Sequence, residues 1–302
     1  MKTVLDIHGL SKNFDKQAIL QDLHLTIREG DIYGLIGKNG AGKTTLIKII
    51  TQLLFADKGT VSLFSSKTEN EWSKSLSRVG SVIESPVAHN HLTAYQNLKY
   101  YCMIRHIPND DQVIRETLDY VGLPDTGKKV FRDFSLGMKQ RLGIAIALLS
   151  KPDFLILDEP INGLDPIGIK EFRLMIQRLN QEKGITILIS SHILSELYLV
   201  ANRFGILDQG KIIREISKAE FETLSEDYIV LKTADQEKAC QVLKEQIHLQ
   251  FKVINPENEI HIFGQEQDVK QILKELTLAD VAIDEIYYAR QNLEEYFTQL
   301  VE

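Results

Sequence analysis

The sequence predicts an α/β protein with a mostly parallel sheet, followed by a smaller α+β unit. Three observations support this prediction. Apolar strand-like runs alternate with helical segments between residues 154 and 207, a pattern typical of βαβ units. A glycine-rich segment at 37–44 joins an apolar run at 32–36 to a helical segment at 45–50. Residues 228–288 show strand and helix patterns in the order β-α-β-β-α-β.

Periodicity predicts the remaining elements of the first unit. Alternating polar and apolar residues predict short strands within residues 3–28, most clearly at 3–8 and 21–27. Further strands are expected at 61–64 and 78–83, and the period becomes helical from 91 to 150. The βαβ alternation then predicts strand 154–157, helix 169–182, strand 185–189, helix 193–200 and strand 203–207.

The second unit is expected to begin near Asp227 with a ferredoxin-like order of elements. A last helix over 292–301 would place Leu293, Tyr296, Phe297 and Leu300 on one stripe. That stripe packs onto its own small domain or, as a less favoured alternative, faces a partner. The elements expected before it are strand 228–232, helix 236–246, strands 251–254 and 260–263, helix 268–276 and strand 281–288.

Composition excludes several classes of protein. The chain has 302 residues, 43% apolar and 25% charged, which is enough for one large domain or two smaller ones. Its formal charge of −7 and the lack of a long basic block argue against a nucleic-acid partner. No apolar run approaches the ~20 residues of a membrane helix. Asp6 and His8 interrupt any signal peptide, and the lone Cys102 and Cys240 are expected to be reduced in a cytosolic protein.

The glycine-rich segment matches the pattern G-x-x-x-x-G-K-[ST] at every fixed position. Between a strand and a helix, such glycines turn backbone N–H groups toward a phosphate, and the helix dipole adds positive potential. Lys43 would reach the β- and γ-phosphates, and the Thr44 hydroxyl would ligate Mg²⁺. The alternative is an ordinary turn before a helix. The residues expected to hold the nucleotide are Gly37, Lys38, Asn39, Gly40, Ala41, Gly42, Lys43, Thr44 and Thr45.

Two carboxylates follow the apolar run at 154–157. Ligands of open α/β sheets sit at the carboxyl ends of strands, so Asp158 is placed to hold Mg²⁺, directly or through water. Glu159 lies one residue further, where a carboxylate can orient an attacking water and take its proton. An Asp-Glu pair is a weak signal alone, but together with the phosphate-binding segment it predicts nucleotide hydrolysis.

Ser135 precedes an apolar helical run that continues to Leu149. It is a favourable N-cap residue, and Gly137 allows close approach to the backbone. By itself this segment, Ser135-Leu136-Gly137-Met138-Lys139-Gln140-Arg141, is a capped helix. Its order in the chain, about twenty residues before Asp158, gives it further meaning.

In this order the motifs of residues 1–225 resemble those of the nucleotide-binding subunit of ATP-binding cassette (ABC) transporters. The resemblance implies a RecA-like core, an antiparallel β-subdomain, a helical subdomain at about 85–150 and an accessory domain at 226–302. It implies that residues 37–44 are the Walker A loop, Asp158 the Walker B aspartate and Glu159 the catalytic glutamate. Ser135 and Gly137 match the Leu-Ser-Gly-Gly-Gln signature, whereas Leu136 and Met138 do not.

The resemblance assigns three further residues, each with a simpler alternative. Asp165 belongs to the D-loop, although Gly-Leu-Asp-Pro is also a good turn. His192 is the switch histidine that donates to the γ-phosphate, or else a satisfied histidine after a buried strand. Phe14 falls where an aromatic ring stacks on adenine, or else it belongs to the core.

Glu84 departs from the family pattern, which normally has Gln after the strand at 78–83. A carboxylate there adds negative charge beside Mg²⁺ and could bind the metal more directly, so Glu84 is expected to hold Mg²⁺ together with Thr44 and Asp158. It cannot donate a hydrogen bond unless protonated. The Glu variant, with the Ser-Leu-Gly-Met signature, resembles lantibiotic- and bacitracin-resistance exporters. The alternative is that Glu84 is a steric substitute.

The resemblance implies an ATPase that binds ATP and Mg²⁺ and pairs head to tail with a second cassette, a homodimer being expected. It would power export, of peptide antibiotics by analogy, through separate membrane permease subunits, at the inner face of the cell membrane. The alternative is a non-transport ABC ATPase. DNA-maintenance types would show a long heptad coiled coil, ribosomal types two cassettes, and iron–sulfur assembly types are disfavoured by Glu84 and the added domain.

Overall fold

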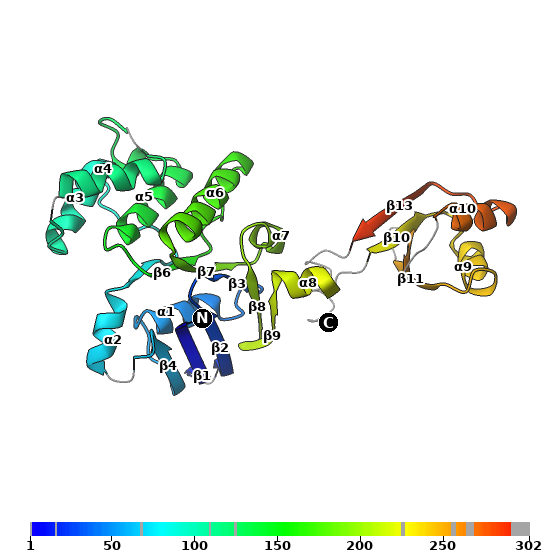
Figure 1. Cartoon of the computed structure of the whole chain (residues 1–302), viewed down its shortest axis with the longest axis horizontal. Helices are drawn as coiled ribbons and strands as arrows, with labels where there is room; N and C mark the ends of the chain where they lie inside the picture. Colours follow the sequence, from blue (N-terminus) through cyan, green and yellow to red (C-terminus); the bar gives the residue numbers. More distant parts are fainter. Residues whose placement is uncertain are drawn as a thin grey trace. The chain divides into compact units, whose positions relative to one another are not determined.

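The computed structural model describes residues 2–15, 17–66, 69–108, 110–123, 126–224, 227–254, 258–263 and 269–290. The chain divides into two compact units, Met1–Lys218 and Ala219–Glu302 (Figure 1). This division lies a little before the boundary at 225 that the sequence predicts. In the part of the chain that the structure describes, the strands form three sheets.

The central sheet of the first unit has the strand order β5-β6-β7-β3-β8-β9. The strands from β5 to β8 pair in parallel, which confirms the predicted mostly parallel sheet, and β9 joins β8 as an antiparallel hairpin that the sequence analysis missed. The buried strands are continuous apolar runs because both faces of a parallel sheet are covered. Their bounds are Ile32–Ile36 (β3), Val79–Val82 (β5), Phe154–Asp158 (β6), Thr186–Ser191 (β7), Arg203–Asp208 (β8) and Lys211–Ser217 (β9).

A second sheet is antiparallel, with β1 (Thr3–Phe14) between β2 (Gln17–Arg28) and β4 (Lys58–Leu63). Its strands alternate buried and exposed residues over much of their length, as expected when one face packs on a core. Both β1 and β2 are longer than the short strands expected from the sequence.

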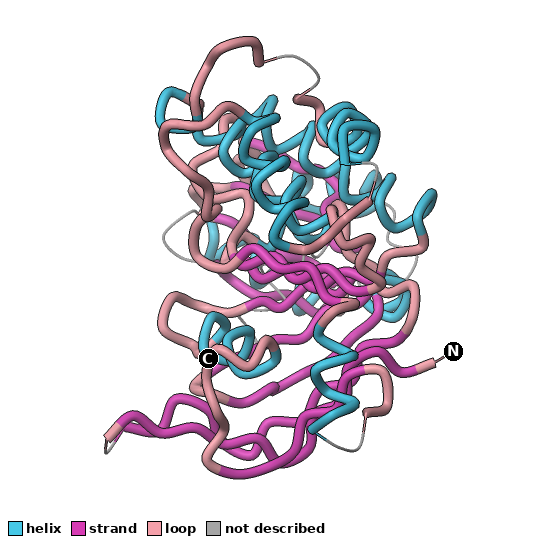
Figure 2. Tube along the Cα trace, turned by 90° about the vertical axis from the view of Figure 1, so that its left-hand side faces the viewer, coloured by secondary structure: helices cyan, strands magenta, loops and turns pink. Residues whose placement is uncertain are grey.

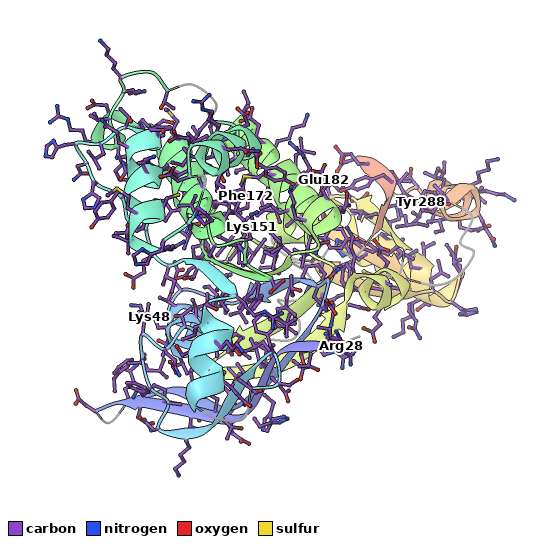
Figure 3. All side chains as sticks on the ribbon, turned by 60° about the vertical axis from the view of Figure 1, so that its left-hand side comes forward. Arg28, Lys48, Lys151, Phe172, Glu182 and Tyr288 are labelled. Carbon is purple, nitrogen blue, oxygen red and sulfur yellow. The ribbon has the colours of Figure 1, made fainter. Side chains whose placement is uncertain are left out.

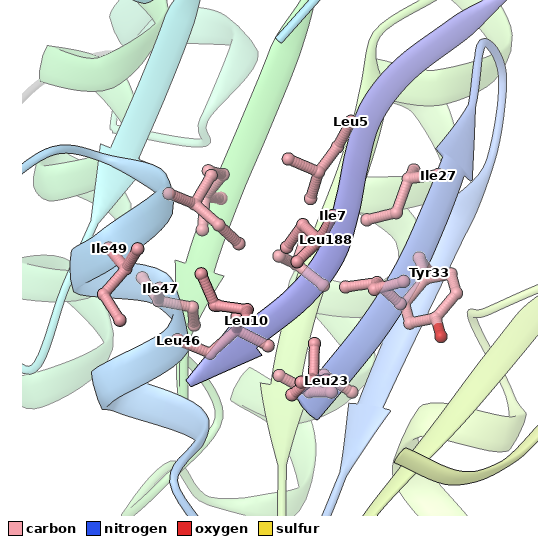
Figure 4. Packing of buried hydrophobic residues seen from close by; sticks show 14 of the residues in the cluster. Leu5, Ile7, Leu10, Leu23, Ile27, Tyr33, Leu46, Ile47, Ile49 and Leu188 are labelled. Atoms are coloured by element: carbon pink, nitrogen blue, oxygen red, sulfur yellow. The ribbon is translucent and has the colours of Figure 1, made fainter. Parts of the chain in front are cut away.

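Helix α1 (Lys43–Ile50) packs between residues of both sheets (Figure 4). Leu46, Ile47 and Ile50 are fully buried, with side chains of β1, β2, β6 and β7 in the same hydrophobic cluster. Burying aliphatic side chains of this size contributes about 1.5–3 kcal/mol each. The packing therefore fixes the helix whose first turn follows the glycine-rich segment.

Helices α3 to α6 gather at one side of the central strands, whereas α2 lies beside β4 (Figure 1 and Figure 2). A capping box at Thr93 starts α3, and Ser135 caps α5. Asp165 caps α6, which ends at Gly184 in the left-handed conformation. The expected helix at 193–200 is shorter, and α2 was not expected. The bounds are Glu69–Leu76 (α2), Ala94–Ile104 (α3), Asp110–Tyr120 (α4), Leu136–Leu148 (α5), Pro166–Lys183 (α6) and Leu194–Tyr198 (α7).

Helix α8 (Lys218–Leu224) spans the boundary between the units, and the elements after it follow the expected β-α-β-β-α-β order. Their sheet has the order β11-β12-β10-β13 and every pair is antiparallel. Apolar residues of these strands and of α9 and α10 form a separate core. The bounds are Asp227–Lys232 (β10), Gln236–Glu245 (α9), Gln250–Ile254 (β11), Glu259–Phe263 (β12), Val269–Leu278 (α10) and Glu285–Arg290 (β13).

The strand expected at 281–288 begins at Glu285, so that prediction is wrong over its first four residues. The backbone of Ala282 bonds to side chains instead. Its N–H donates to Asp235 Oδ2 at 3.0 Å and its carbonyl accepts from Thr233 Oγ1 at 2.5 Å. The helix expected at 292–301 lies outside the described residues. No helix in the described ranges is long and apolar enough to span a membrane.

Candidate functional site

The glycine-rich segment joins the carboxyl end of β3 to the first turn of α1. Gly40 and Gly42 have φ angles of 84° and 109°, which residues with a Cβ rarely adopt. A Cβ on Gly42 would also lie 2.7 Å from Leu20 Cδ2. Lys38, Asn39 and Gly40 are exposed, whereas Ala41 and Gly42 are buried and Thr44 and Thr45 half-buried. The segment therefore presents an accessible loop at the amino end of a helix, where anions bind.

The Lys43 ammonium folds back over this loop although its side chain is only 5% exposed. Nζ donates to the carbonyl oxygens of Gly37 and Lys38 at 2.7 and 3.2 Å. It also lies 3.0 Å from Glu159 Oε1, but that oxygen accepts no aligned hydrogen bond from the described residues. The contact with Glu159 is therefore an ion pair without hydrogen-bond alignment, and the ammonium remains available to a stronger anionic partner.

Asp158 ends β6 and is buried, with a hydroxyl group on each carboxylate oxygen. Thr44 Oγ1 donates to Oδ2 at 2.8 Å, and Ser190 Oγ donates to Oδ1 at 2.6 Å. Ser190 Oγ in turn accepts the backbone N–H of Glu159 at 2.9 Å. Ser190 was missed as a site residue. Its signal was the polar Ser190-Ser191 pair at the end of an apolar strand.

The residues expected to hold Mg²⁺ are only partly brought together. Thr44 and Asp158 touch and offer hard oxygen ligands, which suit Mg²⁺ completed by phosphate and water oxygens. No group of three or more His, Cys, Asp or Glu side chains in the described ranges forms a self-sufficient metal site. The pair therefore fits a magnesium ion that arrives with a nucleotide.

Glu84 stands apart from that pair. It follows β5, the parallel neighbour of β6, and has a φ of 59°. Its Oε1 pairs with Lys48 Nζ of α1 at 2.5 Å. The structure therefore gives Glu84 a cationic partner that the sequence analysis did not anticipate.

His192 and Glu159 meet at the carboxyl ends of β7 and β6. His192 Nδ1 lies 2.9 Å from Glu159 Oε2, with the histidine side chain 37% and the glutamate side chain 18% exposed. Glu159 has a φ of 48°, a left-handed conformation that is uncommon for a side chain of this size. Strained backbone of this kind is typical of functional sites.

The predicted signature residues lie at the start of α5. Ser135 is exposed, and its Oγ accepts the backbone N–H of Met138 at 3.3 Å. Leu136, which departs from the family pattern, lies against the turn that contains Gly163, because a Cβ on Gly163 would be 2.7 Å from Leu136 Cδ2. Gly137 lies next to Leu164. The predicted signature and the predicted D-loop therefore touch within one chain.

Asp165 and Phe14 complete the predicted set. Asp165 Oδ1 accepts the backbone N–H of Gly168 at 2.7 Å, so the residue caps α6. Phe14 is 47% exposed at the end of β1, which argues against the alternative that it belongs to the core. The end of this strand is held by Asp57, whose carboxylate accepts hydrogen bonds from Lys12 Nζ at 2.7 Å and from the backbone N–H of Asn13 at 2.6 Å. The hydrogen bond from Lys12, reinforced by that from Asn13, lowers the pKa of Asp57.

The fold and this site define a nucleoside-triphosphate-binding protein of the phosphate-loop class. A glycine-rich loop runs from the parallel strand β3 into a helix. Strand β6, separated from β3 by β7, ends in Asp158 and is followed by Glu159. The comparisons with known proteins narrow the class.

The family model described as "ABC transporter" matches residues 20–162. The bacitracin transport ATP-binding protein BcrA of Enterococcus faecalis is 38% identical over 100% of this chain and 97% of its own. The lantibiotic transport ATP-binding protein SrtF of Streptococcus pyogenes is 44% identical, over 74% of this chain and 95% of its own. A solved ATP-binding subunit of an ABC transporter has a TM-score of 0.64 at 28% identity, covering 73% and 92% of the two chains.

The chain belongs to the ATP-binding proteins of ABC transporters. The predicted family, cassette fold, ATP binding and ATPase activity are thereby confirmed. The match to SrtF leaves about a quarter of this chain uncovered, whereas the match to BcrA covers all of it.

Proposed function

We propose that this ATPase hydrolyses Mg-ATP in a head-to-tail pair of cassettes to power export through a separate membrane permease. The observation that carries the proposal is the position of Glu159, held by Lys43 on one carboxylate oxygen and by His192 on the other. A carboxylate beside the phosphate-binding loop can orient water for attack on a terminal phosphoryl group.

The other site residues take complementary roles in this proposal. The backbone of residues 37–45 cradles the phosphates, and Lys43 neutralises their charge. Thr44 and Asp158 hold Mg²⁺, with Glu84 near it, and the metal would supply charge neutralisation on the phosphates. His192 donates to the γ-phosphate, and the exposed ring of Phe14 stacks on adenine.

The head-to-tail pairing is supported by Ser135 and Asp165. Both are exposed and both cap helices, so each presents a helix start to the outside of the cassette. A helix start whose exposed serine hydroxyl can still donate its proton is a second anion site that the chain's own loop does not need. We infer that Ser135 and Gly137 of one cassette cover the γ-phosphate bound by the other, and that the pair is a homodimer.

A permease partner is supported by an exposed apolar patch formed by α3 and by Val87, which lies three residues after Glu84. Tyr100, Met103 and Ile104 lie on one side of α3 and are 40%, 67% and 56% exposed. Val87, 75% exposed, is held beside this helix because its carbonyl accepts Tyr101 Oη at 3.1 Å. Apolar side chains gathered at a surface in this way mark an interaction site. We assign this patch to the permease, with the ATPase at the inner face of the membrane.

The proposed cargo and the proposed role of the second unit rest on relatives that match this chain over its whole length. BcrA is named for bacitracin transport and is matched over 97% of its length, which supports an antibiotic of this kind as cargo. We infer export as the direction from the resemblance to resistance exporters that Glu84 carries. We assign residues 1–225 to the nucleotide-binding domain and 226–302 to a ferredoxin-like accessory domain. The non-transport alternative, in DNA maintenance, ribosome function or iron–sulfur assembly, predicts no membrane partner.

Purification from native membranes tests the proposal. A tagged chain should co-purify with an integral membrane protein, and the complex in vesicles should move a peptide antibiotic only with hydrolysable ATP. Glu159→Gln should bind the same partner without moving the peptide. Recovery of the ATPase from the soluble fraction without any membrane protein would refute the export function and favour the non-transport alternative.

A further inference from the structure

Helix α1 contacts two neighbouring strand ends through residues one turn apart. Thr44 and Lys48 are separated by four positions and so lie on the same side of the helix. Thr44 Oγ1 donates to Asp158 at the end of β6, and Lys48 Nζ pairs with Glu84 just after β5. β5 and β6 are parallel partners, with Val82 beside Leu157. The two contacts are therefore adjacent links between one helix and one edge of the sheet.

This edge of the sheet carries three carboxylates, and their negative charge opposes the binding of a triphosphate unless it is offset. Asp158 is the last residue of β6, Glu159 follows it, and Glu84 lies two residues beyond the end of β5. Glu159 has Lys43 and His192 as partners, and Asp158 has two hydroxyl groups that bring no charge. Glu84 has Lys48, labelled in Figure 3, at 2.5 Å. Like charges repel over several ångströms even at a protein surface, so the charge of Glu84 acts on any bound phosphate.

The pair is also a geometric restraint. Glu84 has a φ of 59°, and the next residue closes a tight turn in which Ser85 N donates to Ile83 O at 2.7 Å. Lys48 is 36% and Glu84 61% exposed at the side chain, so the ion pair is partly screened by solvent. Its effect on binding is therefore expected to be modest and measurable at low salt.

We propose that Lys48 is a positioning residue for Glu84: their ion pair holds the carboxylate against α1 and cancels its charge beside the triphosphate. This inference rests on the proposed position of Glu84 near the bound nucleotide. Without Lys48 the free carboxylate repels ATP, most strongly when no divalent cation is present to offset it. Lys48 thus allows a glutamate to occupy position 84 without a loss of ATP affinity.

The test is a double-mutant cycle in which ATP affinity is measured by calorimetry at low salt, once in EDTA and once with Mg²⁺. Lys48→Met should weaken binding about three- to tenfold in EDTA and less with Mg²⁺, whereas Lys48→Arg should preserve binding. Glu84→Gln in the Lys48→Met background should restore affinity in EDTA to near the wild-type value, because the repelling charge is gone. Lys74→Met, on α2, is the control for loss of one positive charge.

An equal loss from Lys48→Met in the wild-type and Glu84→Gln backgrounds would overturn the proposal, because Lys48 would then act on the phosphates directly. Equal losses in EDTA and in Mg²⁺ would overturn it too. Thermal melts of each variant separate a folding defect from a binding defect. If the proposed export function is wrong, transport will be missing but the double-mutant cycle on ATP affinity will still show coupling. The failure of the export function is therefore distinguishable from the failure of the proposal for Lys48.

Discussion

His192 Nδ1 lies 2.9 Å from Oε2 of Glu159, although the two residues are 33 positions apart. The register of the sheet creates this contact: β6 and β7 run parallel with Asp158 beside Ser190, so the residues that follow leave the sheet at the same edge. Lys43 approaches the other carboxylate oxygen of Glu159. The proposed function assigns both partners to phosphate, so Glu159 is held by the groups that a bound nucleotide would engage.

Glu159→Gln should retain ATP binding and lose hydrolysis by about 10²–10⁴-fold, because an amide cannot take a proton from the attacking water. Steady-state phosphate release measures turnover, and equilibrium binding measures affinity. Glu182→Gln is a matched control, since that side chain is half exposed and pairs with Arg178 on α6. Near-normal turnover in Glu159→Gln would remove this residue from the role of base.

Lys43→Ala should weaken ATP binding itself by roughly 10- to 100-fold, as expected for one lost charge-assisted hydrogen bond of about 1.5–3 kcal/mol. Titration of the purified protein with ATP gives the affinity directly. Lys183→Ala removes an equivalent charge from the last turn of α6 and should leave the affinity unchanged. Unchanged affinity in Lys43→Ala would contradict the proposed phosphate loop.

Ser135→Arg should block ATP-driven dimerisation and spare nucleotide binding by the monomer. A large side chain at this exposed helix start would fill the space intended for the phosphate of the other cassette. Size-exclusion runs with ATP, in a Glu159→Gln background that keeps ATP intact, separate the two species. Ser73→Arg, on α2, is the control. Dimers that persist in Ser135→Arg would count against the head-to-tail arrangement.

Asp57→Asn should lower stability at neutral pH, with an effect that disappears in acid. The hydrogen bonds from Lys12 and Asn13 lower the folded-state pKa of Asp57, so its contribution is present above the ordinary value of about 3.9. That contribution is lost as the pH falls through the folded-state pKa, because the wild-type carboxyl then becomes neutral as well. Thermal midpoints of both proteins, followed from pH 7 down to about pH 2, provide the comparison. A constant difference would contradict the role of the charge.

Several elements could be predicted because their information is local. The run at 154–158 and the glycine-rich segment before α1 each carry their pattern within a few residues. The β-α-β-β-α-β order of the second unit is legible from periodicity in the same way. The start of β13 could not be predicted from periodicity, because the Asp235 side chain accepts a hydrogen bond from the backbone of Ala282, 47 positions further along the chain.

The same distinction between local patterns and long-range contacts applies to the residues of the site. Residues 37–45, Asp158 and Glu159 could be named from the sequence, since the residue types and spacing already state the chemistry. Lys48 could not be named, because nothing near it in the chain marks a role. The polar Ser190-Ser191 pair was a signal, but it did not reveal that Ser190 meets Asp158, 32 positions away. The contact of Leu136 with Gly163 depends likewise on how α5 packs against a distant turn.

The amino-acid sequence alone determined that this chain binds a nucleoside triphosphate and which strands and helices carry the motifs, because glycines, charges and apolar periods act over neighbouring residues. The tertiary structure decided which cation or hydroxyl meets each carboxylate. Those pairings depend on strand register and on the path of α1 along the sheet edge, and both are set by packing between segments more than 30 residues apart.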